Sequence, residues 1–362
     1  MNTRALLRSW STVLPAASAL LLALTWSAKP QGALALLVGL VLAGTVLAAV
    51  QHAEVIAHKV GEPLGSIILA VSVTVLEVGM IAMSMSGAQP KPTLARDTVF
   101  AAVMISLNGV VGAALFVNAG RRGHARFRPR STGEMLATVT ALATLTMVLP
   151  NFTSNAGPTF RPAQLAFAGL MSVALYVLFI ATQSTTHRDY FLPVDADGNL
   201  MPDTEHAAPP SARKTATSGV LLAISLIAVV GLAKVVTPAL SSLIEGVGLP
   251  GSVVGVVIAA LVLGPETTAA VRAASRDRVQ TSMNLAYGSS VASIGLTIPA
   301  LALMSPLLPS PLVLGLEPLH MVLLALTVVV GVLTVVSGRA TRLQAGVHLT
   351  VLAAYVYLVA VP

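Results

Sequence analysis

Apolar runs of about twenty residues alternate with short polar segments along nearly the whole chain. A helix rises 1.5 Å per residue, so each run is long enough to cross a hydrocarbon core of about 30 Å. The pattern predicts eleven membrane-spanning helices, at residues 11–28, 32–52, 64–86, 98–119, 133–150, 162–183, 217–240, 251–272, 279–305, 313–336 and 343–361. Unbroken runs do not fit the alternating strands of a transmembrane barrel, so the predicted fold is an all-α integral membrane protein.

Composition supports lipid as the solvent. Of the 362 residues, 55% are hydrophobic and 10% are charged, whereas a soluble domain carries roughly 25% charged residues. The net charge of +7 does not indicate nucleic-acid binding, because the basic residues lie in short loops between the apolar runs. Cysteine is absent, which excludes disulfides and thiolate metal sites.

The basic residues also predict the orientation. If the N-terminus lies in the cytoplasm, sixteen of the 21 basic residues fall in inside loops or in the N-terminal segment, four fall in outside loops, and Lys234 lies near the outer end of a helix. Cytoplasmic loops of membrane proteins are enriched in Lys and Arg. We therefore expect a multi-pass protein of the cell (inner) membrane with a cytoplasmic N-terminus.

A weak internal repeat divides the chain. Leu94–Phe116 and Ala274–Thr297 both open on an Arg-Asp dipeptide and both reach a small polar cluster after the same interval. We expect an extra N-terminal helix (1–30), a five-helix repeat (31–183), a polar cytoplasmic linker (184–218) and a second five-helix repeat (219–362). An odd number of helices makes the repeats inverted, as in many secondary transporters.

Each half places one acid inside a predicted span. Glu77 lies in Ile67–Met85 and Glu266 in Ser252–Val271. A carboxylate at the bilayer centre costs about 2.5–3.5 kcal/mol even on insertion scales, and such residues commonly mark ion or proton pathways. The two glutamates are therefore the predicted cation and proton site.

Oxygen-bearing side chains accompany both glutamates. Thr74 lies three residues before Glu77 and shares its helix face. Pro265 disturbs the helix just before Glu266, and Thr267 and Thr268 follow it. The partner helices contribute Ser106, Asn108, Ser289, Ser290 and Ser293. No His or Cys lies in the spans near the glutamates, so the donor set suits Ca²⁺ better than zinc or copper.

These residues resemble the two α-repeats of ChaA-type bacterial calcium/proton antiporters, in the calcium/cation antiporter superfamily. The first resemblance runs from Gly61-Glu62-Pro63-Leu64-Gly65 to Val73-Thr74-Val75-Leu76-Glu77, and the second from Gly264-Pro265-Glu266 to Gly288-Ser289-Ser290. It implies that Glu77 and Glu266 bind Ca²⁺ and exchange it for protons, with Thr74, Asn108, Ser289 and Ser290 nearby. Ca²⁺ is then the transported substrate, and no cofactor is expected.

The sequence also departs from this family pattern. Many relatives have Gly-Asn before each glutamate, where this chain has Val73-Thr74 and Val262-Leu263, and Thr267 replaces a common histidine. Exchange of Na⁺ or K⁺ for protons therefore stays open as an alternative substrate choice.

Two other functional classes are weaker alternatives. A cation channel usually has oligomeric symmetry around a continuous pore, and inverted repeats within one chain argue against it. An intramembrane hydrolase is disfavoured because no His-Glu-x-x-His or Gly-x-Ser-x-Gly motif is present and no histidine within the spans is expected to act as a base.

Overall fold

The computed structural model describes residues 3–61, 64–86, 91–186, 188–191 and 210–362. The first half contains the helices α1 (Thr3–Thr25), α2 (Gly32–Val60), α3 (Leu64–Met85), α4 (Leu94–Met104), α5 (Val111–Arg122), α6 (Pro129–Ala143), α7 (Pro162–Ala181) and α8 (Arg188–Phe191). The second half contains α9 (Ala212–Gly246), α10 (Val253–Ser275), α11 (Val279–Ala292), α12 (Ile298–Met304), α13 (Pro318–Val336) and α14 (Arg342–Ala360).

Short π- and 3₁₀-helical turns connect or extend several of these helices. The π-helical segments are η1 (Ile105–Val110), η2 (Thr144–Val148), η4 (Thr182–Thr186) and η5 (Ser293–Thr297). The 3₁₀ segments are η3 (Leu149–Phe152) and η6 (Ser305–Leu307). Among the described residues, the only extended structure is an antiparallel pair of two-residue strands, β1 (Ala125–Arg126) and β2 (Arg339–Ala340).

All eleven predicted spans fall on helices, and the nearly all-helical class is confirmed. Ten helical segments of the described chain are long and apolar enough to cross a membrane, and Trp10–Thr25 of α1 is a shorter apolar helix. Several predicted starts differ by four or more residues from those in the structure. The span predicted from residue 313 begins at Pro318, because proline without an N–H is favoured at the first helical position and Glu317 is the N-cap.

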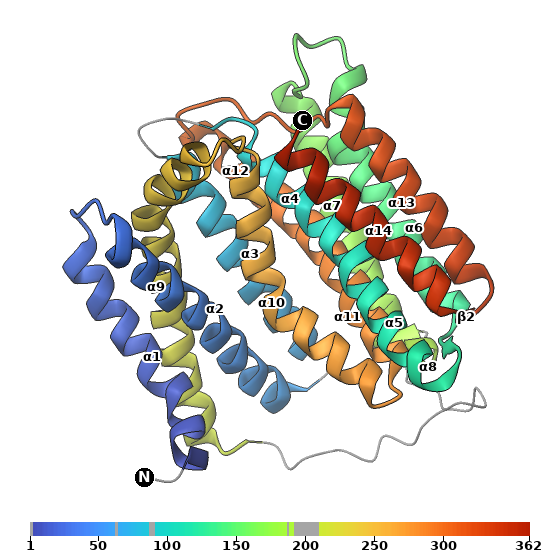
Figure 1. Ribbon diagram of the computed structural model, residues 1–362, viewed down its shortest axis with the longest axis horizontal. Helices are drawn as coiled ribbons and strands as arrows, with labels where there is room; N and C mark the ends of the chain where they lie inside the picture. Colours follow the sequence, from blue (N-terminus) through green and yellow to red (C-terminus); the bar gives the residue numbers. More distant parts are fainter. Residues whose placement is uncertain (1–2, 62–63, 87–90, 187, 192–209) are drawn as a thin grey trace.

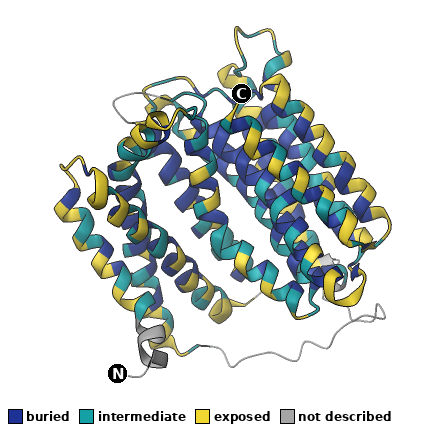
Figure 2. Cartoon of the chain, viewed as in Figure 1, coloured by how far each residue is buried: buried dark blue, intermediate teal, exposed yellow. Residues whose placement is uncertain are grey.

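Apolar side chains cover the outside of the bundle as well as its interior. Figure 2 shows exposed residues along the outward faces of the helices, and many of them are large and apolar, such as Leu170, Leu178 and Leu333. A protein in water would bury these groups, whereas a surrounding of lipid tails accepts them. This distribution agrees with a multi-pass membrane protein.

The helices form two groups in space. The helices α1, α2 and α9 pack together on one side of the molecule, and α4 to α7 and α11 to α14 lie on the other side (Figure 1). Helices α3 and α10, which contain the two glutamates, lie between the groups. Helix α3 packs against η5 of the second half, and α10 packs against α4 and η1 of the first half. Each glutamate helix thus contacts the opposite half.

The repeated Arg-Asp dipeptide joins the halves at two places. Arg96 is buried at the start of α4, where its Nη2 lies 3.0 Å from Glu317 Oε1 and its Nη1 donates to the Gly315 carbonyl at 3.2 Å. The span predicted from residue 98 begins at Leu94 and therefore includes Arg96.

In the second Arg-Asp dipeptide, the aspartate and not the arginine forms the contact with the other half. Asp277, in the turn between α10 and α11, accepts a hydrogen bond from Asn118 Nδ2 at 3.0 Å and pairs with Arg122 of α5. The Arg122 hydrogen bond lowers the pKa of Asp277. The two contacts show how the repeated dipeptide connects first-half and second-half helices.

Helix α10 packs closely against the backbone of α4 at Gly255, so we expect Gly255→Ala to destabilise the fold. A Cβ there would lie 2.9 Å from the backbone nitrogen of Thr98 and 3.0 Å from the backbone carbon of Asp97. Backbone atoms cannot move aside, and overpacking of this kind costs about 1–3 kcal/mol. Thermal unfolding in detergent should show a lower Tm.

Gly39→Ala is the matched control. Gly39 also lies in a membrane helix, but no atom lies within 4 Å of an added Cβ, so the Tm should stay the same or rise slightly. An equal loss of Tm in both variants would show that the close packing at Gly255 does not matter.

Candidate functional site

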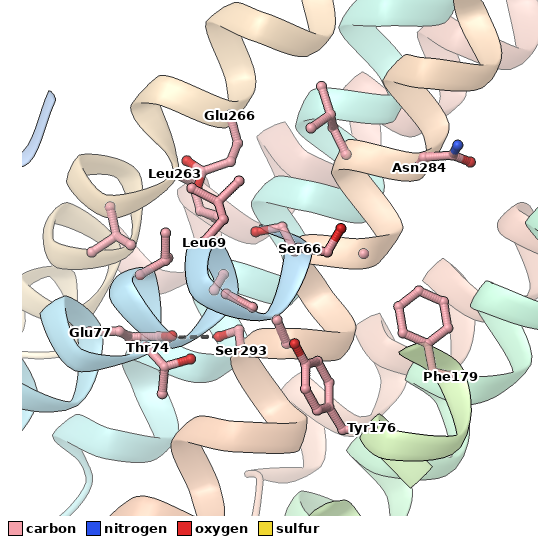
Figure 3. A pocket seen from close by; sticks show the side chains of 18 of the residues that line it. Ser66, Leu69, Thr74, Glu77, Tyr176, Phe179, Leu263, Glu266, Asn284 and Ser293 are labelled. Atoms are coloured by element: carbon pink, nitrogen blue, oxygen red, sulfur yellow. Dashed lines mark hydrogen bonds between the residues drawn. The ribbon is translucent and has the colours of Figure 1, made fainter. Parts of the chain in front are cut away.

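A cavity of about 160 Å³ lies among helices α3, α7, α10 and α11. Both intramembrane glutamates line it, together with other oxygen-bearing side chains from both halves. The polar lining residues are Ser66, Thr74, Glu77, Tyr176, Gln183, Glu266, Asn284, Ser289 and Ser293. Figure 3 shows several of these side chains around the cavity. Residues far apart in sequence therefore meet at one polar site inside the bundle.

Glu77 accepts hydrogen bonds from two hydroxyls of the opposite half. Its side chain is 3% exposed, and Ser293 Oγ donates to Oε1 at 2.7 Å (Figure 3). Thr297 Oγ1 donates to Oε2 at 2.8 Å. Both donors lie in the π-helical segment η5, and π-helical turns often occur at functional sites. Both carboxyl oxygens of Glu77 therefore accept a hydrogen bond from the opposite half.

Glu266 has a different environment. Its Oε2 is buried and has no hydrogen-bond partner among the described residues. The two threonines that follow it bond to their own helix: Thr267 Oγ1 donates to the Leu263 carbonyl and Thr268 Oγ1 to the Pro265 carbonyl. An unmatched carboxylate oxygen in a cavity is a group that a proton or a cation would stabilise.

The repeat explains this asymmetry. When the Arg-Asp dipeptides are aligned, Ser293 and Thr297 correspond to Ala113 and Val117. Alanine and valine cannot donate hydrogen bonds, so the first half offers Glu266 no equivalent of the two hydroxyls that contact Glu77.

The structure brings some of the predicted site residues together and not others. Thr74 and Ser289 line the cavity with both glutamates. Ser290 is buried, does not line the cavity, and donates to the Ala286 carbonyl at 3.3 Å. Glu62 and Pro63, part of the first family-like motif, lie outside the described residues.

Asn108 lies in a separate polar cluster and does not line the cavity. Its Nδ2 donates to Thr327 Oγ1 at 2.9 Å, and its Oδ1 lies 3.3 Å from His348 Nδ1. His348 Nε2 in turn lies 3.1 Å from Thr334 Oγ1. Asn108 therefore links η1 to α13 and α14.

Two buried polar residues that contact predicted site residues were not predicted from the sequence. Thr297 was not singled out, although its spacing of four from Ser293 would place both on one helix face. His348 was not singled out either, although it lies in the predicted span 343–361 and is buried in α14. A histidine in the middle of the last apolar run was the available signal.

The site supplies two carboxylates and several neutral oxygens. Among the described residues, no group of three or more His, Cys, Asp and Glu side chains is placed to hold a metal. Glu54 of α2 and Glu77 both lie close enough to Glu266 to repel its negative charge. Such a cavity can hold protons on the carboxyl groups or a hard cation between oxygens.

The sequence comparisons identify relatives of this chain. The family model described as sodium/calcium exchanger protein matches residues 9–185 and 217–361. The chain is 42% identical over 359 residues to the putative ionic transporter y4hA of Sinorhizobium fredii, covering 98% of this chain and 96% of that protein. It is 31% identical over 306 residues to the sodium-potassium/proton antiporter ChaA of Escherichia coli, covering 84% and 83% respectively.

The fold is similar to that of solved transporters. The crystal structure of the H⁺/Ca²⁺ exchanger CAX matches with a TM-score of 0.68 and 14% identity, over 96% of this chain and 93% of that chain. At this identity the match concerns the fold alone.

Removal of both hydroxyl donors to Glu77 should weaken cation binding. Hydrogen bonds to charged groups contribute about 1.5–3 kcal/mol, and they hold this carboxylate in one orientation. In a Ser293→Ala/Thr297→Val variant we expect the Kd for Ca²⁺ to rise by about tenfold, roughly 1.4 kcal/mol. Isothermal titration calorimetry of the detergent-purified protein measures this change.

Ser290→Ala is the control for that experiment, because its hydroxyl is buried in the same helix but bonds to backbone outside the cavity. If Ser290→Ala weakens binding as much as the double variant does, the hydrogen bonds to Glu77 are not what holds the cation.

Proposed function

The chain belongs to the sodium/calcium exchanger family, and from that premise we propose that it exchanges cytoplasmic Ca²⁺ for protons through the cavity lined by Glu77 and Glu266. Members of this family are secondary transporters and not enzymes, so the cavity is a transport site. The observation that best supports the proposal is the shared cavity, which one carboxylate from each half lines and in which Glu77 accepts hydrogen bonds from two hydroxyls of the opposite half.

Competition for the same two carboxylates provides the coupling. Two bare carboxylates in a low-dielectric cavity repel each other, and desolvation penalises both charges. Either protons on the carboxyl groups or one divalent cation between them removes this cost. Because the same groups bind both, the protein releases one when it takes up the other. Two protons for each Ca²⁺ would leave the charge of the site unchanged.

Helices α3 and α10 lie between two helix groups, which suits alternating access. A relative displacement of the group formed by α1, α2 and α9 would expose the cavity first to one face and then to the other. The proposed arrangement is an extra N-terminal helix (1–30) followed by inverted repeats at 31–183 and 219–362. It is inserted in the inner membrane with the N-terminus and the linker (184–218) in the cytoplasm.

Exchange of Na⁺ or K⁺ for protons is the second candidate. A relative of 31% identity is named a sodium-potassium/proton antiporter. The absence of Asn108 from the cavity lining also removes one oxygen ligand. Ca²⁺ takes six to eight oxygens, so the loss of this ligand leaves the predicted Ca²⁺ site less complete.

Everted membrane vesicles test both candidates. We expect Ca²⁺ to dissipate a preformed proton gradient in vesicles with the wild-type protein. Glu77→Gln and Glu266→Gln should each reduce this proton movement at least tenfold, because an amide neither binds a proton nor neutralises a cation. The same assay with Na⁺ and K⁺ measures selectivity.

Glu245→Gln is the control, since Glu245 is 58% exposed and pairs with Lys91 away from the cavity. Full Ca²⁺-dependent proton movement in both glutamine variants at the cavity would refute the shared carboxylate site. A response to Na⁺ or K⁺ without a response to Ca²⁺ would replace the first candidate by the second.

A further inference from the structure

The β1–β2 ladder places two arginines opposite each other. Arg126 and Arg339 are register partners, and the burial pattern puts both on the exposed side of the ladder while Ala125 and Ala340 are buried. Directly opposed residues in an antiparallel pair have Cβ atoms about 4.5–5.5 Å apart, and like charges there are destabilising. Neither arginine forms an ion pair or hydrogen bond through its side chain with another described residue. The pair therefore lacks a counter-charge within the described chain.

An apolar groove of about 940 Å³ begins beside this ladder. Strand β1 leads into α6 and β2 follows α13. Helices α6 and α13 pack against each other, and residues of both line the groove. Its apolar walls include Gly133, Leu136, Ala137, Val332, Val335 and Val336. Gly133 contributes no side chain, and a Cβ added there would meet Val335 Cγ1 at 3.7 Å.

The groove is longer than the hydrocarbon part of one lipid leaflet, so an acyl chain fits along it. Its α6-side lining runs from Pro129 to Leu145, a rise of about 24 Å at 1.5 Å per residue. One leaflet of a hydrocarbon core of about 30 Å accounts for about 15 Å. Val332 and Val336 are exposed on this surface, so the groove opens towards the surrounding lipid.

The charge at the end of the groove remains positive. Arg130 lines the groove, but its Nε lies 3.7 Å from Glu134 Oε1 and its guanidinium lies over the Tyr190 ring at 4.8 Å. Glu134 thus balances Arg130, while Arg126 and Arg339 stay unbalanced. This end also lies on the face that the positive-inside rule assigns to the cytoplasm.

We propose that the groove between α6 and α13 binds an anionic phospholipid, with its acyl chains along the apolar walls and its phosphate at Arg126 and Arg339. A phosphate accepts hydrogen bonds from two guanidinium groups and relieves their repulsion. A basic pocket beside membrane helices is a known arrangement for lipid headgroups. The proposal is independent of the cation that the protein transports.

Native mass spectrometry of the purified full chain tests the proposal with phosphatidylglycerol and phosphatidylcholine as probes. We expect wild type to retain phosphatidylglycerol in preference to phosphatidylcholine. Arg126→Gln/Arg339→Gln should weaken phosphatidylglycerol binding at least tenfold. Gly133→Leu and Val332→Phe, which fill the groove, should weaken it with the two arginines intact.

Arg272→Gln/Arg276→Gln is the matched control. These arginines are also exposed and lie on the same proposed face, but they lie at the C-terminal end of α10 and not in the β1–β2 ladder. The control should keep the wild-type affinity for phosphatidylglycerol. An equal loss in the control would mean that general surface charge attracts the lipid, and the site would be refuted.

Two further outcomes would also overturn the proposal. If an equal concentration of inorganic phosphate displaces phosphatidylglycerol, the two arginines form a site for soluble anions and the groove does not contribute to binding. A dimer in wild type that Gly133→Leu dissociates, with unchanged lipid binding, would identify a second copy of the chain as the occupant. The Tm of each variant is measured alongside, and Val332→Phe serves if Gly133→Leu does not fold.

Discussion

The hydrogen bonds between Glu77 and the hydroxyls of Ser293 and Thr297 are the interaction on which the arrangement of the two halves depends. A charged carboxylate at membrane depth is stable only when other groups replace its hydration. Here the acid comes from the first half and both donors come from the second. The two hydrogen bonds that stabilise the buried carboxylate of Glu77 therefore also fix how α3 and η5 pack.

Glu266 shows what happens when such donors are missing. The first half presents apolar residues at the positions equivalent to Ser293 and Thr297, and Glu266 keeps an unpaired buried oxygen. A native fold normally satisfies buried polar atoms, so an exception at a cavity indicates function more than poor packing. The two acids are related by the repeat but are not equivalent. Glu77 is held in place by protein hydrogen bonds, whereas Oε2 of Glu266 has no partner among the described residues.

The helices could be predicted from sequence because hydrophobic length is a local property. Each span is a long apolar run, and only details such as the start at Pro318 differed. The two glutamates and Ser293 could also be predicted from the sequence as site residues, because a polar residue in an apolar run stands out. Asn108 stood out for the same reason, yet it contacts Thr327 and His348 away from the cavity. The direction of a side chain depends on helix rotation, and the π-helical segment η1 changes that rotation locally.

Positive charge on one face of the bundle serves more than one purpose in this structure. Arg122 pairs with Asp277 and joins the halves, whereas Arg126 and Arg339 face each other with no acidic partner among the described residues. A shift of the strand register by one residue would move the two arginines out of opposition and avoid the repulsion between them. The repulsion also falls if an anion from the membrane surface lies between the guanidinium groups, and the adjacent groove has the apolar walls that such an amphiphile needs. The same lipid that makes buried glutamates costly thus supplies the counter-charge at the edge of the bundle.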